Sequence, residues 1–228
     1  MEYAVISGDI ISSTSLNSAD KQVLTEQLTQ LLTDLQQHFN VYARLIKGDY
    51  IECVVPEAGR ALQVCLAIKS FVKTIPISEE TMSAEKQRAK LFKEYGVRLA
   101  IGYGSLDRFL PEEGIIDGEA IYLSGRTINT KSTHDKERIV IKNTLFFASK
   151  EEKTTRKWSA FLELLDVLLN KATQRQCQVV YLKLLGNNEA NISEILGIDQ
   201  SVVNRHSTNA GWNAIDTAIS YFYESITR

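Results

Sequence analysis

Two aspartates stand where a folded chain could bring carboxylates together. Asp9 follows the apolar run at residues 3–6, and Asp49 stands beside Gly48 between two stretches rich in apolar and β-branched residues. A glycine followed by a small polar residue is typical of a two-residue hairpin turn. Neighbouring carboxylates repel one another and need a cation, and Mg²⁺ takes a few carboxylates together with substrate phosphates. The pair is therefore a candidate site for Mg²⁺ or Mn²⁺, although Gly-Asp is also common turn chemistry without a further role.

The hydrophobic pattern predicts the elements that would position these carboxylates. Strands are expected over 3–6, within a hairpin at 41–55, and over 97–104 and 138–141; helices are expected over 17–39, 58–73, 78–95 and 118–131. With the helix at 78–95 taken as an insertion, the order of the first six matches the ferredoxin-like βαββαβ unit. Its first and third strands are antiparallel neighbours, so the end of the first strand meets the tip of the hairpin. Gly102 and Gly104 predict that something approaches the backbone of the strand 97–104 closely. The segment 105–117 is expected to be a loop.

Length and composition limit the classes of protein. The 228 residues are 44% hydrophobic and carry a net charge of −2, which favours a globular chain without a bulk charge for nucleic acid or membrane. Cys53, Cys65 and Cys177 match no zinc spacing and are expected to be free thiols, the first two buried. No signal peptide and no run of the ~18 apolar residues that a membrane helix needs is present. We therefore expect a soluble cytoplasmic protein.

The charged stretch 149–157 is the expected linker between a domain at 1–148 and a helical domain at 158–228. Within the second domain, the sequence from Ile192 to Val203 resembles a helix-turn-helix of the sigma-factor and response-regulator type. In this resemblance Ile192 and Ile195 pack inward, Gly197 makes the turn, Asp199 caps the second helix, and Val203 faces the core.

The second helix of that motif would read base edges in the major groove of DNA, for which asparagine, glutamine and arginine are the usual side chains. The expected DNA-binding residues are Gln200, Ser201, Asn204, Arg205, His206 and Asn209. Residues 151–228 hold eight Lys or Arg against nine Asp or Glu, and this balance is unfavourable for neutralising phosphates. A helical domain that binds protein therefore stays open as the alternative.

The first domain resembles the class III nucleotide cyclases, the family of adenylate and guanylate cyclases. Four blocks in the family's order carry the resemblance: 5–14, 47–55, 97–104 and 118–126. The predicted fold is thus α+β, with a ferredoxin-like, nucleotide cyclase-like domain followed by an all-α helix-turn-helix domain.

The cyclase resemblance implies a set of site residues. Asp9 and Asp49 would bind the metal together with the carbonyl of Ile10, and Arg126 would stabilise the transferring phosphoryl group. The candidate nucleotide contacts are Arg44, Gly48 and Tyr122. The sequence departs from the family because Tyr122 replaces an asparagine and the base-selecting Lys and Asp have no clear counterparts. A homodimer is expected, since the family's site forms between two protomers.

The whole chain resembles a bacterial family of small proteins called SatD-like. The expected function is a dimeric cytoplasmic transcription regulator in which the cyclase-like domain senses a nucleoside triphosphate or cyclic nucleotide, or only dimerises, while the helix-turn-helix binds DNA. The alternative is a metal-dependent nucleotidyl cyclase or a related phosphoryl-transfer enzyme using Asp9, Asp49 and Arg126. A dimeric scaffold in which neither site works is the third possibility.

Overall fold

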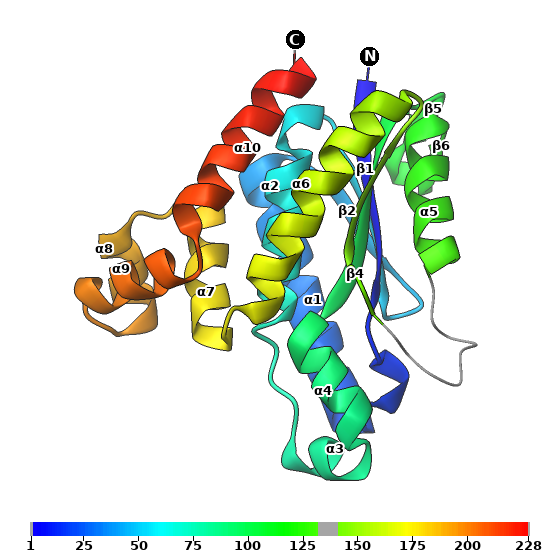
Figure 1. Ribbon diagram of the computed structural model, residues 1–228. Coiled ribbons are helices and arrows are strands. Elements are labelled where there is room, and N and C mark those ends of the chain that lie inside the picture. Colours follow the sequence, from blue (N-terminus) through cyan, green and yellow to red (C-terminus); the bar gives the residue numbers. More distant parts are fainter. Residues whose placement is uncertain (1, 132–140, 228) are drawn as a thin grey trace.

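The computed structural model describes residues 2–131 and 141–227 and has an α+β fold (Figure 1). Five strands of this described part form a mixed sheet in the order β2-β3-β1-β4-β7. They are β1 (Glu2–Ile10), β2 (Tyr42–Ile46), β3 (Tyr50–Val55), β4 (Val97–Ser105) and β7 (Leu145–Ser149). Only β4 and β7 pair in parallel; the other neighbours are antiparallel. The predictions of an α+β fold and of antiparallel pairing between the first and third strands are confirmed.

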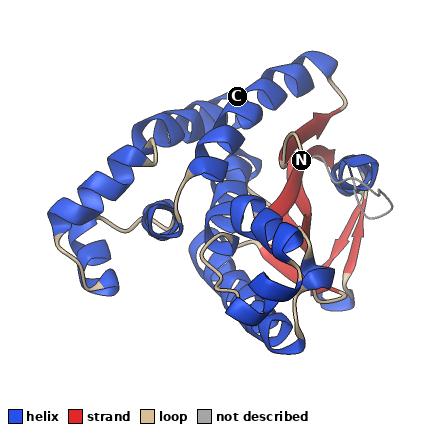
Figure 2. Ribbon diagram, turned by 60° about the horizontal axis from the view of Figure 1, so that its bottom comes forward, coloured by secondary structure: helices blue, strands red, loops and turns tan. Residues whose placement is uncertain are grey.

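Helices cover both faces of the sheet (Figures 1 and 2). α1 (Ser18–Phe39) and α2 (Ala61–Val72) share a hydrophobic core with Ile6, on one face of β1. α5 (Glu119–Lys131) covers the other face, where Ala120 packs with Val5. Successive side chains of a strand point to opposite faces, so β1 contributes to both layers.

α1 begins where its sequence predicts. The side chain of Asn17 accepts a hydrogen bond of 2.8 Å from the amide of Asp20, which satisfies a backbone donor at the start of the helix. The buried stripe follows helical spacing and consists of Leu24, Leu28, Leu31, Leu35 and Phe39. The helix expected over 17–39 is confirmed, with this cap at its start and this stripe facing the core.

The two glycines of β4 allow α5 to lie directly on the strand. A Cβ atom at Gly102 would lie 2.1 Å from the carbonyl oxygen of Ala120 and 2.7 Å from the amide nitrogen of Ser124. A Cβ at Gly104 would lie 2.8 Å from a carboxylate oxygen of Glu119. The predicted close approach is confirmed, and the approaching group is the first part of α5 itself.

Three expected elements differ from the structure. The helix expected over 78–95 is two helices, α3 (Glu79–Ala84) and α4 (Lys86–Tyr95), because Glu85 between them has the non-helical angles φ −128° and ψ 48°. The expected loop 105–117 contains a small antiparallel hairpin, β5 (Arg108–Leu110) and β6 (Ile115–Asp117).

The strand expected over 138–141 falls outside the described residues except for Ile141, which is not in a strand. The fifth strand of the described sheet is β7, where Leu145 and Phe147 are buried beside β4. The short apolar run in β7 thus forms a strand that was not expected.

The C-terminal region is helical. Its helices are α6 (Glu152–Lys171), α7 (Gln174–Leu184), α8 (Glu189–Leu196), α9 (Gln200–Asn209) and α10 (Trp212–Thr227). The stretch 149–157, expected as a linker, is mostly the first part of α6. Trp158 and Leu162 of α6 and Phe222 of α10 belong to the same buried cluster as Ile6 of the sheet. The helical region therefore shares a core with the sheet, and the division at residue 148 stays a prediction.

A buried ion pair ties α2 to α6. Lys69 Nζ lies 3.4 Å from Asp166 Oδ1 and donates a hydrogen bond of 2.5 Å to Thr144 Oγ1. Thr144 donates from its amide to Asp166 Oδ2 at 2.5 Å. Both charged side chains are buried, and burial lowers the pKa of Lys69 to about 8 while Asp166 favours its charged form. Lys73 adds a second link by donating to the carbonyl of Leu169 at 2.5 Å.

Within the described residues, no helix is both long enough and apolar enough to span a bilayer.

Candidate functional site

The predicted site lies where β1 ends beside the loop between β2 and β3. β1 continues beyond residue 6 to Ile10, so Asp9 stands inside the strand rather than in a turn after it. Asp9 is the cross-strand partner of Tyr50, and the amide of Ile10 donates a hydrogen bond of 3.0 Å to the backbone carbonyl of Asp49. The backbones of Asp9 and Asp49 are therefore close together, as the topology predicts.

The side chain of Asp9 is engaged by an arginine. Arg98, its cross-strand partner on β4, donates from Nε to Asp9 Oδ1 at 3.0 Å and from Nη2 to Asp9 Oδ2 at 2.6 Å. The guanidinium also donates to the carbonyl of Lys131 at the end of α5. The side chain of Asp9 is only 15% exposed and that of Arg98 only 5%. Paired N–H groups on both carboxylate oxygens form one of the stronger charge-assisted contacts in proteins, so the charge of Asp9 is neutralised within the chain.

The side chain of Asp49 belongs to a separate environment. Its Oδ2 accepts a hydrogen bond of 2.7 Å from Ser13 Oγ. Ile46 pairs with Tyr50, so the turn holds three residues instead of the expected two. Lys47 and Gly48 have φ of 53° and 87° in this turn, and Ser12 opposite has φ of 59°. Left-handed backbone at residues other than glycine is uncommon and clusters at functional sites.

Asp49 opens onto a pocket of 350 Å³ between the loop after β1, the start of α1 and the β2–β3 turn. The pocket is lined by Ser13, Thr14, Lys21, Leu24, Thr25, Lys47, Gly48 and Asp49. Lys21 and Lys47 are both exposed there, so two cations and several hydroxyl groups face one carboxylate. The pocket suits a small anion better than a cation.

The carboxylate arrangement does not fit a two-aspartate Mg²⁺ or Mn²⁺ site. Both oxygens of Asp9 accept from Arg98, so a metal ion would compete with that guanidinium for the carboxylate. No group of three or more His, Cys, Asp or Glu placed to hold a metal occurs in the described parts of the chain. Ile10, whose carbonyl was the third expected ligand, is only 2% exposed.

The candidate nucleotide contacts and the candidate catalytic arginine lie apart from this pocket. Arg44 on β2 donates to Glu52 at 2.6 Å and to the carbonyl of Gly114 at 2.5 Å, which joins the sheet to the β5–β6 hairpin. Tyr122 on α5 is exposed and donates to Asp117 at 2.5 Å, and this hydrogen bond raises the pKa of its phenol. Arg126, one turn further along α5, is exposed. Of these candidates, only Gly48 lines the pocket with Asp49.

The second candidate region is the group α7, α8 and α9. Val179, Ile192 and Val203, one from each helix, form a small core of their own, separate from the main one. Gly197 between α8 and α9 has φ of 61°, and Asp199 is the N-cap residue of α9 although its side chain makes no capping hydrogen bond. The predicted burial of Ile192 and Val203 and the predicted turn are confirmed.

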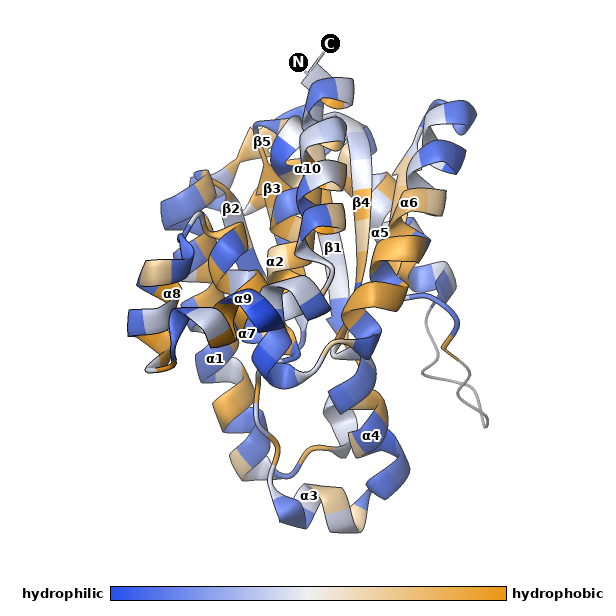
Figure 3. Ribbon diagram, turned by 60° about the vertical axis from the view of Figure 1, so that its left-hand side comes forward, coloured by the Kyte–Doolittle hydropathy of each residue, from blue (hydrophilic) through white to orange (hydrophobic). Residues whose placement is uncertain are grey.

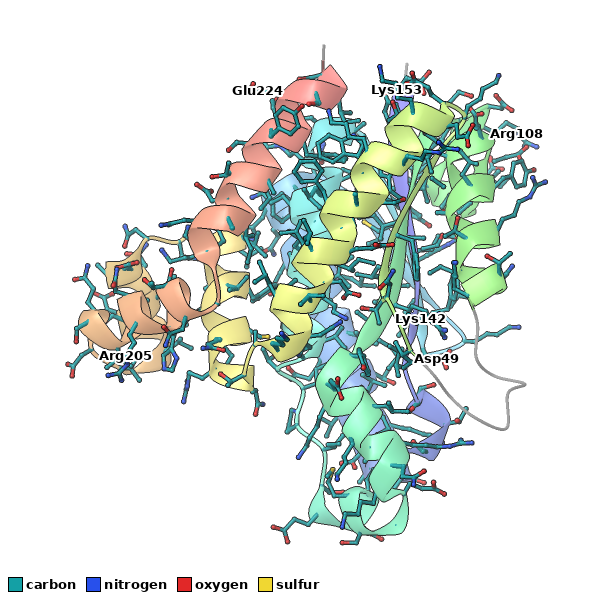
Figure 4. All side chains as sticks on the ribbon, in the orientation of Figure 1. Asp49, Arg108, Lys142, Lys153, Arg205 and Glu224 are labelled. Atoms are coloured by element: carbon teal, nitrogen blue, oxygen red, sulfur yellow. The ribbon has the colours of Figure 1, made fainter. Side chains whose placement is uncertain are left out.

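The prediction that Ile195 packs inward is wrong, because its side chain is 58% exposed and Leu196 and Ile198 pack on the small core instead. Five of the six expected DNA-binding residues are exposed on α9, namely Gln200, Ser201, Asn204, Arg205 and Asn209. The sixth, His206, is half-buried. Arg205 and Asp49 lie at separate ends of the molecule (Figure 4).

Several residues of the pocket were not predicted from the sequence. Arg98, which lies outside the pocket, was not predicted either, because its pairing with Asp9 depends on strand register. Lys21 and Lys47 line the pocket and were not predicted. The position of Lys47 beside Gly48 in a hairpin turn is a signal that could have identified it. Lys21 lies near the start of a helix, where the sequence offers no comparable signal.

The fold is distantly similar to the catalytic domains of adenylyl and guanylyl cyclases. A bacterial light-regulated adenylyl cyclase matches with a TM-score of 0.44 and 14% identity over 64% of this chain, which is 43% of that chain. The guanylyl cyclase Cya2 matches with a TM-score of 0.43 and 14% identity over 70% of this chain and 78% of the other. The chain thus spans less than half the length of the first of these. No protein-family model matches the sequence, and no curated protein matches it either.

Proposed function

We propose that this protein is a DNA-binding regulator of the SatD-like kind, in which α8, its turn and α9 act as a helix-turn-helix. The observation that carries the proposal is the separate small core of α7, α8 and α9, which fixes α9 and leaves its polar face exposed. A recognition helix needs such a rigid support and such a free face to enter the major groove.

The side chains of α9 suit that role. The helix carries Arg205 and His206 and no acidic residue along its length. Asn204 and Arg205 are exposed side by side, and both types make bidentate contacts with base edges. The acidic residues that precede α9 most closely in the sequence lie on α8 and at Asp199, the N-cap residue of α9. Glu189 accepts from Lys183 at 3.0 Å, which offsets its charge next to the groove-facing helix.

Replacing Arg205 with alanine is expected to weaken binding to a preferred DNA sequence by about 5- to 150-fold, because one arginine contact to a base contributes about 1–3 kcal/mol. The probe is a duplex selected by the full-length chain from a random-sequence library, and the measurement is fluorescence anisotropy at two salt concentrations.

Arg88→Ala is the matched control, since it removes the same charge from an exposed site on α4. Binding of the selected duplex should be unchanged in this variant. If selection enriches no sequence, or if Arg88→Ala and Arg205→Ala weaken binding equally, the helix-turn-helix proposal is wrong.

As a second candidate function, we propose that the pocket at Asp49 binds a phosphate-bearing ligand of the nucleoside triphosphate class. The pocket holds Lys21, Lys47 and the hydroxyls of Ser13 and Thr14 around one carboxylate. Strained loops from two elements meet there, at Ser12 and at Lys47. Such strain persists where the surrounding structure holds it for a purpose. Catalysis by a carboxylate-bound metal pair is not part of the proposal, because Arg98 occupies Asp9.

Thermal unfolding with nucleoside triphosphates and cyclic nucleotides, with and without Mg²⁺ or Mn²⁺, tests this pocket. A ligand at ~100 times its Kd stabilises the native state by about 2.7 kcal/mol. Lys21→Ala is expected to weaken binding at least about tenfold, since a hydrogen bond to a charged group contributes about 1.5–3 kcal/mol. Lys90→Ala on α4 is the control and should bind normally.

Asp49→Asn separates two modes of binding. Removing the one acidic group of the pocket should leave binding of an anion unchanged or tighter. If Asp49→Asn instead abolishes a stabilisation that requires Mg²⁺, the ligand is held through a metal. No stabilisation by any of these compounds would contradict a nucleotide site.

A further inference from the structure

α6 and α10 form an antiparallel pair on the outside of the molecule. The N-terminal part of α6 meets the C-terminal part of α10, where the rings of Trp158 and Phe222 lie 4.6 Å apart. At the other end, Gly211 at the start of α10 approaches Leu168 of α6. Lys153 and Glu224 consequently lie at the same end of the molecule (Figure 4).

The outer surface of this pair carries an apolar groove, named here the α6–α10 groove. It has a volume of 690 Å³ and is lined by Phe161, Leu164, Leu165, Leu168, Asn213, Ala214, Thr217, Ala218 and Tyr221. Leu164 is 70% exposed and Tyr221 is 46% exposed. Four of the nine large hydrophobic side chains that are exposed in the described chain line this groove. The apolar residues of α6 are visible in Figure 3. Contiguous exposed apolar surface marks an interaction site.

The two sides of the groove differ in shape. α6 contributes bulky side chains, chiefly Phe161, Leu164 and Leu168. α10 contributes mostly smaller side chains, among them Ala214 and Ala218, with Tyr221 as its one bulky residue in the groove. In a two-fold interface each surface meets itself, so a contact of α6 with α10 occurs twice. The bulky residues of one copy therefore match the small residues of the other.

The charges of the two helices also complement one another. α6 carries four basic residues, and of its three acidic residues Asp166 is buried against Lys69, which leaves an excess of two positive charges on its surface. α10 carries Asp216 and Glu224 and no Lys or Arg. A two-fold arrangement that places α6 on α10 brings opposite charges to the rim of the groove.

The available surface lies at the lower end of the range that a dimer needs. The 20 residues of α6 and the 16 of α10 make helices roughly 24–30 Å long. Two helices side by side, each ~10 Å wide, present a footprint of roughly 500 Å² before the relief of the side chains is counted. This is of the same order as the ~800 Å² per partner of a standard stable interface.

We propose that the α6–α10 groove is a homodimer interface, in which α6 of each protomer packs on α10 of its partner and the four helices form a bundle. Bundles of this kind bury apolar stripes such as those of Phe161, Leu164 and Leu168. The inference goes beyond the proposed DNA binding and does not depend on it, because its observations lie on α6 and α10 and not on α9.

Sedimentation velocity of the full-length chain over a wide range of protein concentration tests the interface. The wild type is expected to dimerise, and Leu164→Glu is expected to weaken the dimer about 100-fold or more, since it buries a charge at the centre of the interface. Ala214→Glu should have the same effect from the α10 side. Circular dichroism checks that both variants are folded.

Val167→Glu is the matched control, because Val167 is 50% exposed on α6 but does not line the groove. It should dimerise like the wild type. Cysteine variants test the packing of α6 on α10. Leu164→Cys mixed with Thr217→Cys should form a mixed disulfide, and the native cysteines are buried and will not interfere. A wild type that stays monomeric, or a dimer that Leu164→Glu leaves intact, overturns the proposal.

Discussion

Asp166→Ala is expected to lower the free energy of unfolding by about 3–5 kcal/mol, which is the usual loss when one partner of a buried ion pair is removed. Asp166 is 1% exposed, and its carboxylate accepts from both the amide and the hydroxyl of Thr144. Without it, the ammonium group of Lys69 stays buried with only neutral oxygens around it. Urea denaturation of the wild type and the variant at neutral pH gives the difference.

Glu163→Ala is the control on the same helix, because Glu163 is exposed and bonds only to Asn143 among the contacts of the described chain. Its loss should change stability by less than about 0.5 kcal/mol. The double variant Lys69→Met/Asp166→Leu should be more stable than Asp166→Ala, since it leaves no unpaired charge in the core. A loss below about 1 kcal/mol in Asp166→Ala would show that the pair does not stabilise this core.

The pH dependence of the same variant gives an independent readout. Lys69 has a pKa of about 8 in the folded chain against its ordinary value of 10.5, so between these values the unfolded chain binds more protons and stability rises with pH. Without Asp166 the folded pKa of Lys69 falls further, so this rise begins at a lower pH. The difference in stability between wild type and variant should therefore shrink as pH rises toward 8 and stay constant above it.

Gly102→Ala should destabilise the protein by about 3 kcal/mol or more, because the added methyl group has no room. Its Cβ would lie 2.1 Å from the carbonyl oxygen of Ala120, and this neighbour is helix backbone that cannot rotate away. Insertion of a methylene into a packed core ordinarily costs about 1–3 kcal/mol, and here all of α5 must move. Thermal unfolding monitored by far-UV circular dichroism measures the loss.

The matched control is Gly125→Ala on α5. A Cβ at Gly125 meets nothing within 4 Å, and the residue stands inside the helix. Alanine is favoured over glycine there by about 0.5–1 kcal/mol, so this variant should be more stable than the wild type. If Gly102→Ala is as stable as the wild type, the close packing of α5 on β4 is incorrect.

Local signals in the sequence predict much of this fold. The helix expected over 17–39 is α1, and the side chain of Asn17 caps its start. Gly102 and Gly104 predict a close approach because a strand interior ordinarily avoids glycine. The βαββαβ order predicts that the end of β1 meets the β2–β3 turn, and the backbones of Asp9 and Asp49 are close there. These features depend on a few neighbouring residues, and a single sequence contains that information.

Features that depend on register or on packing between distant segments are not predicted. The pairing of Asp9 with Arg98 follows from the alignment of β1 with β4, and a shift of one residue would turn Arg98 to the other face. The turn at Gly48 is one residue longer than expected, because the hydrophobic pattern alone does not decide which residues pair across it. Ile195 is exposed because the short helix α8 buries only the side facing Val179 and Val203.

The direct passage from β7 into α6 has a consequence for how this chain can be divided. Only Lys150 and Glu151 separate the two elements, and Trp158 and Leu162 then enter the core that the sheet helices build. A fragment ending at β7 would expose the side chains that cover its sheet, and a fragment beginning at α6 would carry half of a hydrophobic core. We therefore expect the sheet and the C-terminal helices to unfold together in one cooperative transition.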